Sequence, residues 1–150
     1  MPAVPELNLA FVDVGDVAKA HVEAMRRPET DGERILITSQ PSFWFKDLAK
    51  ILGKEFRRQG FWVPRYQVPY WMVWVYSFFD KEVAASLNRI GHIIRFDNSK
   101  AKRLLGMEFR DPAESVVEMA YSLIERGIVK KRSGYEGVPS KYCTNNNNSN

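Results

Sequence analysis

Cysteine and histidine are nearly absent from this chain of 150 residues. The single cysteine, Cys143, excludes an internal disulfide framework and a cysteine-based zinc site. The only two histidines, His21 and His92, do not stand beside acidic residues at the spacing of metal ligands. His21 lies among alanines and valines of a helical pattern, which favours a packing role over a catalytic one. We therefore predict no metal site.

Glycine-rich phosphate loops are missing as well, since neither G-x-G-x-x-G nor the P-loop pattern occurs. No serine stands at the spacing of a nucleophile elbow. Asp13 and Asp16 lie three residues apart at a strand-to-helix junction, which suits helix capping better than acid–base chemistry. The chain therefore contains no recognisable set of catalytic residues.

Charge of one sign is not concentrated in the body of the chain. The net charge is +4, but most of it lies from Lys130 onward, which argues against nucleic-acid binding. A hydrophobic content of 45% and a charged content of 27% are typical of a soluble globular domain. No charged segment followed by an apolar stretch opens the sequence, so we expect a cytoplasmic protein.

Long hydrophobic runs are also lacking. The longest, from Tyr70 to Phe79, is about half of the roughly 20 residues that a membrane-spanning helix needs. A helix beginning at Pro69 and reaching about Leu87 is predicted, with its aromatic side chains packed in the interior. The alternative is that this helix contacts a membrane surface.

Three other helices carry clear start and stop signals. A capping side chain satisfies the free N–H groups of a first turn, and a glycine often ends a helix in the left-handed conformation. The predicted pairs of signals are Asp13 or Asp16 with Arg26, Asn98 or Ser99 with Gly106, and Asp111 with Gly127, the last with Pro112 and Glu114 in a capping-box arrangement.

The remaining elements rest on weaker patterns. Apolar and β-branched runs predict short strands over residues 9–14, 34–38 and 92–96, and the second is expected to be covered on both faces. Ser42 is expected to cap a helix that Gly53 ends. Residues 131–150 are polar and end in an asparagine run, which predicts a disordered tail.

Four segments taken together resemble a known family. They are "FVDVGDVAKAHVEAM", "DGERILIT", "RFDNSKAKRLLG" and "ESVVEMAYSLIERGIV", in this order. Over residues 8–129 they resemble the C-terminal half of extended short-chain dehydrogenases/reductases, in the dihydroflavonol-reductase-like and 3β-hydroxysteroid-dehydrogenase-like branch of the NAD-dependent epimerase/dehydratase family. The resemblance implies an α/β fold: the C-terminal part of a doubly wound Rossmann-type domain, mostly its helical substrate lobe, over residues 1–130.

The resemblance also implies a parent reaction, hydride transfer between NADP or NAD and a ketone or secondary alcohol. The family's G-x-x-G-x-x-G turn and Tyr-x-x-x-Lys pair do not occur in this sequence. The Tyr of that pair moves the proton and the Lys lowers its pKa. We therefore expect a fragment that binds neither nicotinamide cofactor by itself and shows no turnover.

Substrate preference follows from departures inside the resemblance. A sugar-nucleotide substrate is disfavoured, because Leu9 replaces an Arg that such family members use and the pattern "RIGH" keeps Arg89 but has His92 in place of Asp. An apolar ketone or a hydroxysteroid is favoured instead. Phe61, Trp62 and Arg89 are the candidate substrate-lining residues.

Two other classes of function stay open at this stage. One is a non-enzymatic binding module that pairs with a full-length relative or with a second copy of itself. The other is a peripheral membrane protein that uses the helix over Tyr70–Phe79. No nucleic-acid partner is expected.

Overall fold

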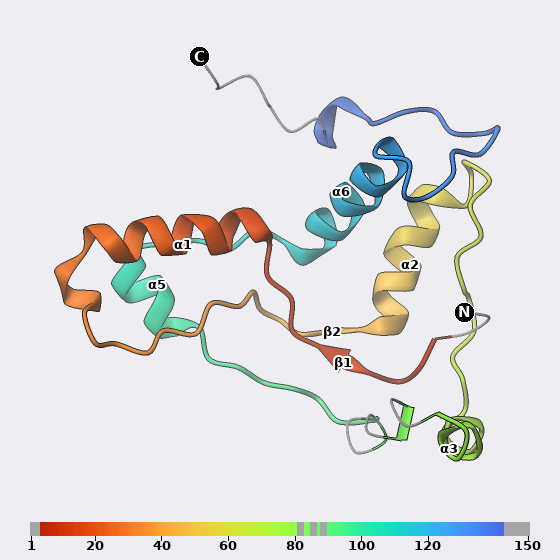
Figure 1. The fold of residues 1–150 in the computed structure, drawn as a ribbon, viewed down its shortest axis with the longest axis horizontal. Helices are drawn as coiled ribbons and strands as arrows, with labels where there is room; N and C mark the ends of the chain where they lie inside the picture. The colour runs from red at the N-terminus through yellow and green to blue at the C-terminus, as the bar shows by residue number, and fades with distance from the viewer. Residues whose placement is uncertain (1–3, 81–82, 85–86, 88–89, 143–150) are drawn as a thin grey trace.

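The computed structural model describes residues 4–80, 83–84, 87 and 90–142 (Figure 1). Its first helix, α1, spans Val14–Arg26 and follows an extended segment. Asp13 caps α1, as predicted, by accepting a hydrogen bond from the Gly15 N–H at 2.7 Å. Asp16, the other predicted cap, lies in the first turn and accepts a hydrogen bond from the backbone N–H of Arg110 at 2.8 Å. A 3₁₀ turn, η1, follows at Pro28–Thr30.

Helix α5, Ser99–Leu105, packs against α1 at one end of the molecule (Figure 1). It ends as predicted at Gly106, whose φ of 61° lies in the left-handed region. Asn98 occupies the position before the helix, but its side chain donates a hydrogen bond to the Thr38 carbonyl at 2.7 Å instead of capping α5. Buried side chains from both helices and from the segment after α5 form a small cluster of Ala20, Leu105 and Met107.

A two-stranded antiparallel sheet precedes the second long helix. Strand β1, Asn8–Leu9, pairs with β2, Phe43–Trp44, and helix α2, Phe45–Phe56, follows directly. The prediction for this region was partly wrong. Ser42 does not cap α2, because the chain continues from it into β2 and Trp44 occupies the position before the helix. Gly53 does not end α2 either, since it is buried within the helix.

The other predicted strands are extended segments without strand pairing. The strand expected over 9–14 is limited to β1, since α1 begins at Val14. Residues 34–38 and 92–96 form no strand, and no backbone–backbone hydrogen bond joins 34–38 to another described segment. Ile35 and Ile37 pack against the cluster between α1 and α5, whereas Leu36 is exposed, so only one face of this segment is covered.

The larger hydrophobic cluster lies between α2 and helix α6, Pro112–Glu125. Asp111 caps α6 by accepting a hydrogen bond from the Ala113 N–H at 2.9 Å, and Pro112 takes the first helical position, as predicted. The Glu114 carboxylate pairs with Lys141 at 2.7 Å rather than closing a capping box. The buried members of the aromatic cluster, as we call it, are Phe56, Val117, Tyr121 and Ile124.

Residues 131–142 pack onto this aromatic cluster, which differs from the disordered tail predicted for them. Tyr135, Val138 and Tyr142 lie against its buried side chains, and a 3₁₀ turn, η3, is formed by Ser140–Tyr142. The ring centroids of Tyr121 and Tyr142 are 5.7 Å apart. The segment is polar on average, but it contains three apolar residues, spaced three to four positions apart, that attach it to the cluster. Residues 143–150 of the predicted tail lie outside the described residues.

Helix α3, Tyr70–Ser77, stands apart from both clusters at the foot of the molecule (Figure 1). None of its side chains is buried, so the prediction of an interior aromatic helix was wrong. Pro69 occupies the position before the helix instead of its first turn. Among the described residues, no helix has the length and apolar character needed to cross a membrane.

Candidate functional site

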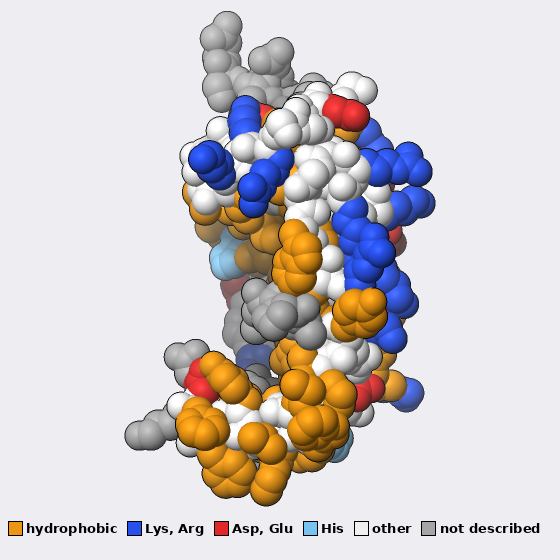
Figure 2. Space-filling model, turned by 90° about the vertical axis from the view of Figure 1, so that its right-hand side faces the viewer, with side chains coloured by type: hydrophobic (Ala, Val, Ile, Leu, Met, Phe, Trp, Pro, Cys, Tyr) orange, Lys and Arg blue, Asp and Glu red, His pale blue; other side chains and the backbone are white. Residues whose placement is uncertain are grey.

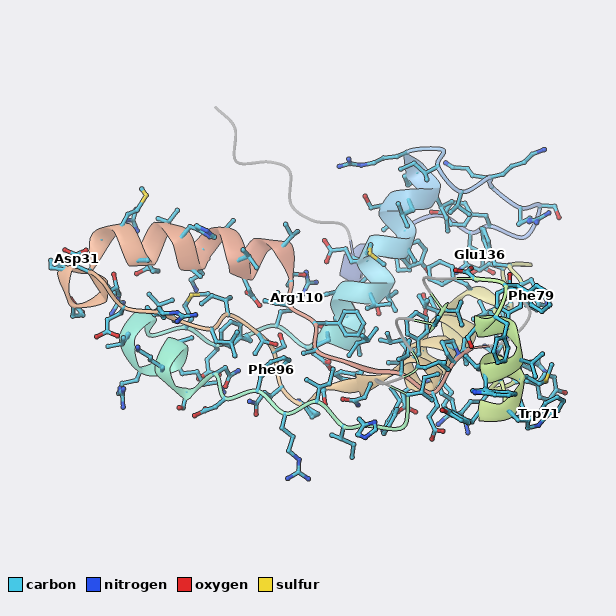
Figure 3. The ribbon with its side chains drawn as sticks, turned by 60° about the horizontal axis from the view of Figure 1, so that its bottom comes forward. Asp31, Trp71, Phe79, Phe96, Arg110 and Glu136 are labelled. Atoms are coloured by element: carbon cyan, nitrogen blue, oxygen red, sulfur yellow. The ribbon has the colours of Figure 1, made fainter. Side chains whose placement is uncertain are left out.

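A groove lies where three extended segments meet, between the helical ends of the molecule. Its volume is about 540 Å³, within the range of small-molecule sites. Four of its side chains are apolar and large, Trp44, Ile93, Ile94 and Phe96, and Phe96 lies near the middle of the molecule in Figure 3. The complete lining comprises Asn8, Ala10, Ser39, Gln40, Pro41, Ser42, Trp44, Ile93, Ile94, Arg95, Phe96 and Asp97.

Side-chain amides hold this groove together in place of a strand ladder. Asn8 is almost fully buried, and its Oδ1 accepts a hydrogen bond from the Ile94 N–H at 2.9 Å. Gln40 Nε2 donates a hydrogen bond to the Phe96 carbonyl. Together with the hydrogen bond from Asn98 to Thr38, these contacts attach residues 94–98 to β1 and to the segment before β2. Chain segments more than 50 residues apart in sequence thereby form one surface.

A second groove brings together two of the predicted substrate-lining residues, Phe61 and Trp62. Its volume is about 420 Å³, and Arg57 and Arg65 also line it. The Arg57 guanidinium donates hydrogen bonds to the carbonyls of Val63 and Pro64 at 3.2–3.4 Å, which fixes the loop after α2. The third predicted residue, Arg89, lies outside the described residues.

Phe61 and Trp62 differ in how far they face solvent. The Phe61 ring packs edge-on against Phe56, with ring centroids 5.8 Å apart, and also against Tyr135 at 6.1 Å. It therefore has a packing role in the aromatic cluster, whatever else it contacts. Trp62 is 66% exposed and is free to meet a ligand.

The carboxylates at the start of α1 form a junction with the segment before α6. The Arg110 guanidinium lies 2.5 Å from Glu118 and 3.7 Å from Asp13, while its backbone N–H is held by Asp16. Arg110 is labelled between α1 and the rest of the chain in Figure 3. This arrangement agrees with the capping and junction role predicted for the two aspartates.

Asp13 is stabilised as a carboxylate at this junction. Partial burial acts to raise its pKa, but hydrogen bonds from Ser115 and from the Gly15 N–H, together with the charge of Arg110, outweigh burial and lower the pKa. A carboxyl group whose pKa is lowered in the folded state adds stability above its unfolded pKa, and that stability is lost as the pH falls through the folded pKa.

Asp13→Asn is accordingly expected to reduce stability at neutral pH, and the difference from the wild type should shrink as the pH falls below about 4. Asparagine is as good a capping residue as aspartate, so this substitution removes the charge and retains the cap. Urea unfolding at a series of pH values measures the difference. Asp31→Asn, at an exposed position in the turn after η1, is the control and should show no such convergence. An Asp13→Asn deficit that is constant with pH would contradict the electrostatic account.

The titratable side chains of the described residues do not form an acid–base pair. Burial and, next, the hydrogen bond to Glu55 raise the pKa of Tyr121 to about 12, so its hydroxyl remains a hydrogen-bond donor at neutral pH. The ring nitrogen Nδ1 of His21 lies 2.8 Å from the Val17 carbonyl in its own helix, and that of His92 lies 3.0 Å from the Ile90 carbonyl. In the described part of the chain, no group of three His, Cys, Asp or Glu side chains could hold a metal ion.

Comparisons with known proteins identify the family. No protein-family model matches the chain. The NADPH-dependent methylglyoxal reductase GRE2 of Saccharomyces cerevisiae is 33% identical over 122 residues, which are 81% of this chain and 31% of the yeast protein. The crystal structure of yeast Gre2 complexed with NADPH matches with a TM-score of 0.58 and 28% identity over 81% of this chain and 35% of that one. The chain belongs to the extended short-chain dehydrogenase/reductase family.

Two further proteins match over most of this chain. The ketoreductase azaE of Aspergillus niger is 29% identical over 80% of this chain and 30% of its own length. The crystal structure of gox2253 has a TM-score of 0.64 at 22% identity and supports the fold alone. The chain thus spans about a third of the length of its curated relatives, which fits the predicted C-terminal part of a Rossmann-type reductase, rich in helices and with few short strands.

The larger groove is the feature that the sequence did not reveal. Residues 34–38 and 92–96 were each recognisable as extended, and the break at Ser39 to Ser42 was visible. Nothing local in the sequence indicates that residues 39–42 and 93–97 line one groove, because a single amide side chain, that of Gln40, makes the hydrogen bond between them. Asn8 in an otherwise apolar stretch was the one available signal.

Proposed function

We propose that this chain forms the substrate-side part of an NADPH-dependent reductase that acts on small apolar carbonyl compounds. The observation that supports this most directly is the 33% identity to the yeast methylglyoxal reductase over 81% of the chain. NADPH is favoured over NADH for two reasons. The yeast relative is NADPH-dependent, and the crystal structure of yeast Gre2 contains NADPH.

The larger groove suits a small carbonyl substrate. Trp44 and Phe96 provide apolar walls, and Ser42 provides a hydroxyl group on the same lining. A binding site for a small molecule is usually apolar with a few converging polar groups. Phe61 and Trp62 line the neighbouring groove and are proposed as a second contact for longer substrates.

The chain's own residues do not fit the dinucleotide. Its nine glycines form no G-x-x-G-x-x-G turn, and none of its six tyrosines is followed by a lysine at the fourth position. When NADPH is bound in such reductases, it supplies the hydride. In this chain, the described residues form a surface whose shape and polarity suit contact with a substrate. Proton transfer and hydride transfer need groups from outside this chain.

A chimeric enzyme tests the proposal. We expect the purified chain to oxidise no NADPH with methylglyoxal or isovaleraldehyde, the compounds named for the yeast reductase. A chimera in which residues 4–142 replace the matched region of that reductase should reduce both aldehydes. In the chimera, Phe96→Ala should raise KM about tenfold, because an apolar wall of the groove is lost. NADPH absorbance follows both reactions.

Controls in the chimera separate the two grooves. Ile128→Ala, at an exposed position after α6 and outside both linings, should leave KM unchanged. If Trp62→Ala raises KM more than Phe96→Ala does, the substrate binds in the second groove and not in the larger one. NADPH oxidation by the isolated chain, or a folded chimera without activity, would contradict the proposal.

One observation favours a second function, the pairing of this chain with a full-length relative. The backbone of residues 34–38 makes no backbone–backbone hydrogen bond to other described residues, and Leu36 is exposed. An extended edge of this kind can accept a strand from another chain. Mixing the isolated chain with the yeast reductase and measuring complex formation by size-exclusion chromatography distinguishes pairing from its absence.

A further inference from the structure

The exposed side chains of α3 form a contiguous aromatic surface (Figure 2). The helix has no buried residue, and Phe78 and Phe79 continue its exposed surface. Trp74 packs edge-on against Phe78, with ring centroids 4.8 Å apart, so these rings contact each other rather than a core. Figure 2 shows the apolar side chains gathered at the lower end of this face. The exposed aromatic surface consists of Tyr70, Trp71, Trp74, Tyr76, Phe78 and Phe79.

This surface is far from the edge where the rest of a reductase sheet would join. In Figure 3, the turn at Asp31 before residues 34–38 lies at one end of the molecule, and Phe79 lies at the other. A strand added to residues 34–38 would therefore not cover α3. A contiguous apolar surface on a soluble protein usually marks a binding surface, so α3 needs an occupant of its own.

Positive charge lies beside the aromatic surface. Helix α2 carries three exposed lysines spaced four residues apart, and the exposed Arg58 continues this spacing in the turn just after the helix. Arg65, also exposed, precedes α3. Side chains four residues apart share one face of a helix. Figure 2 shows Lys and Arg side chains in a column above the apolar surface on the same side of the molecule. The cationic stripe of α2 consists of Lys46, Lys50, Lys54 and Arg58.

We propose that α3 and the cationic stripe of α2 bind the surface of an anionic phospholipid bilayer. Trp and Tyr are enriched where hydrocarbon meets headgroups, and α3 supplies two of each. With eight residues, α3 is about 12 Å long and lies in the interface instead of spanning the bilayer. Lys and Arg beside such a helix are attracted to acidic headgroups. A second copy of the chain is a poorer occupant, because it would bring a second cationic stripe to the contact.

Vesicle sedimentation with the full chain tests this proposal. We expect the wild type to sediment with phosphatidylcholine vesicles that contain phosphatidylserine, and more weakly with phosphatidylcholine alone. The double variant Trp71→Ser/Trp74→Ser should lose about tenfold in affinity. The double variant Lys54→Gln/Arg58→Gln should bind the anionic vesicles more weakly and bind the neutral ones as the wild type does. Added salt should weaken wild-type binding.

Trp62→Ser is the matched control, since Trp62 and Trp71 are 66% and 65% exposed but only Trp71 lies in α3. It should bind as the wild type does. Quenching of wild-type tryptophan emission by brominated lipid chains gives an independent readout that needs no variant. No sedimentation, or equal affinity of the Trp71→Ser/Trp74→Ser variant, would overturn the proposal. If the chain instead self-associates through these tryptophans and does not bind vesicles, α3 is a contact surface between two copies of the chain.

Discussion

Replacing Phe56 by alanine is expected to lower the free energy of unfolding by about 3–5 kcal/mol. Phe56 is 3% exposed and is the last residue of α2. Its ring lies 4.7 Å from that of Tyr121 in α6 and 5.8 Å from that of Phe61. Alanine would leave a cavity between the two helices, because the two rings that contact Phe56 belong to different segments, α6 and the loop after α2, and cannot both move inward. Urea denaturation followed by circular dichroism measures the loss.

Phe79→Ala is the matched control for Phe56→Ala. Phe79 is 85% exposed, so its truncation should change the free energy of unfolding by no more than about 0.5 kcal/mol. The same chemical change is thereby made inside and outside the aromatic cluster. Similar losses for the two variants would mean that α2 and α6 are not held together by the cluster.

Tyr121→Phe is expected to cost about 1–3 kcal/mol, although it removes a single oxygen. The Tyr121 hydroxyl donates a hydrogen bond to Glu55 Oε1 at 2.6 Å and accepts one from Gln59 Nε2 at 2.9 Å. Gln59 is buried, and its Oε1 already lacks a hydrogen-bond partner among the described residues. Phenylalanine would leave Gln59 Nε2 with one hydrogen bond, to the Glu55 carbonyl at 3.3 Å, in place of two. A buried polar group that loses a hydrogen-bond partner is costly.

Tyr135→Phe provides the comparison for Tyr121→Phe. The Tyr135 hydroxyl also donates to a carboxylate, Glu125 at 2.8 Å, but this hydrogen bond is exposed to solvent. Water can replace the lost partner there, so the loss should stay within about 0.5 kcal/mol. Thermal or urea unfolding of the two variants compares buried and exposed hydrogen bonds of one type. Equal losses would show that the partners of Tyr121 are reached by water.

Helix ends were predictable because their signals are local. Asp13 and Asp111 accept hydrogen bonds from N–H groups two residues ahead, and no distant segment is needed for either. Gly106 takes the left-handed conformation at the end of α5 for the same reason. Gly53 shows the limit of this reasoning. Its interpretation as a stop failed because the apolar face of α2 continues to Phe56, and contact with α6 favours a longer helix.

Strands and exposure were less predictable because both depend on what lies beside a segment. Residues 34–38 have the composition of an interior strand, but strand pairing requires a neighbour that the described chain does not offer. The residues of α3 have the composition of a buried helix, and hydrophobicity alone cannot say which surface covers them. Tyr135, Val138 and Tyr142 lie in a polar segment yet pack against the aromatic cluster, since a few apolar residues suffice to anchor a short loop.

The candidate site was predictable in part. Phe61 and Trp62 lie in one groove, and their closeness follows from their adjacency in the sequence. Whether they contact substrate stays a prediction, and so does the role of Arg89. The larger groove depends on Asn8 and Gln40 reaching segments far away in the chain, a pairing that only the folded structure reveals.

The two hydrophobic clusters are built from different residues, and this affects how the molecule opens. The aromatic cluster joins α2 and α6 through large rings, whereas the cluster between α1 and α5 centres on Ala20, Leu105 and Met107. Cooperative opening units follow contiguous packed elements, and a unit that buries less apolar surface opens at lower free energy. The α1–α5 end can thus open while α2 and α6 stay closed.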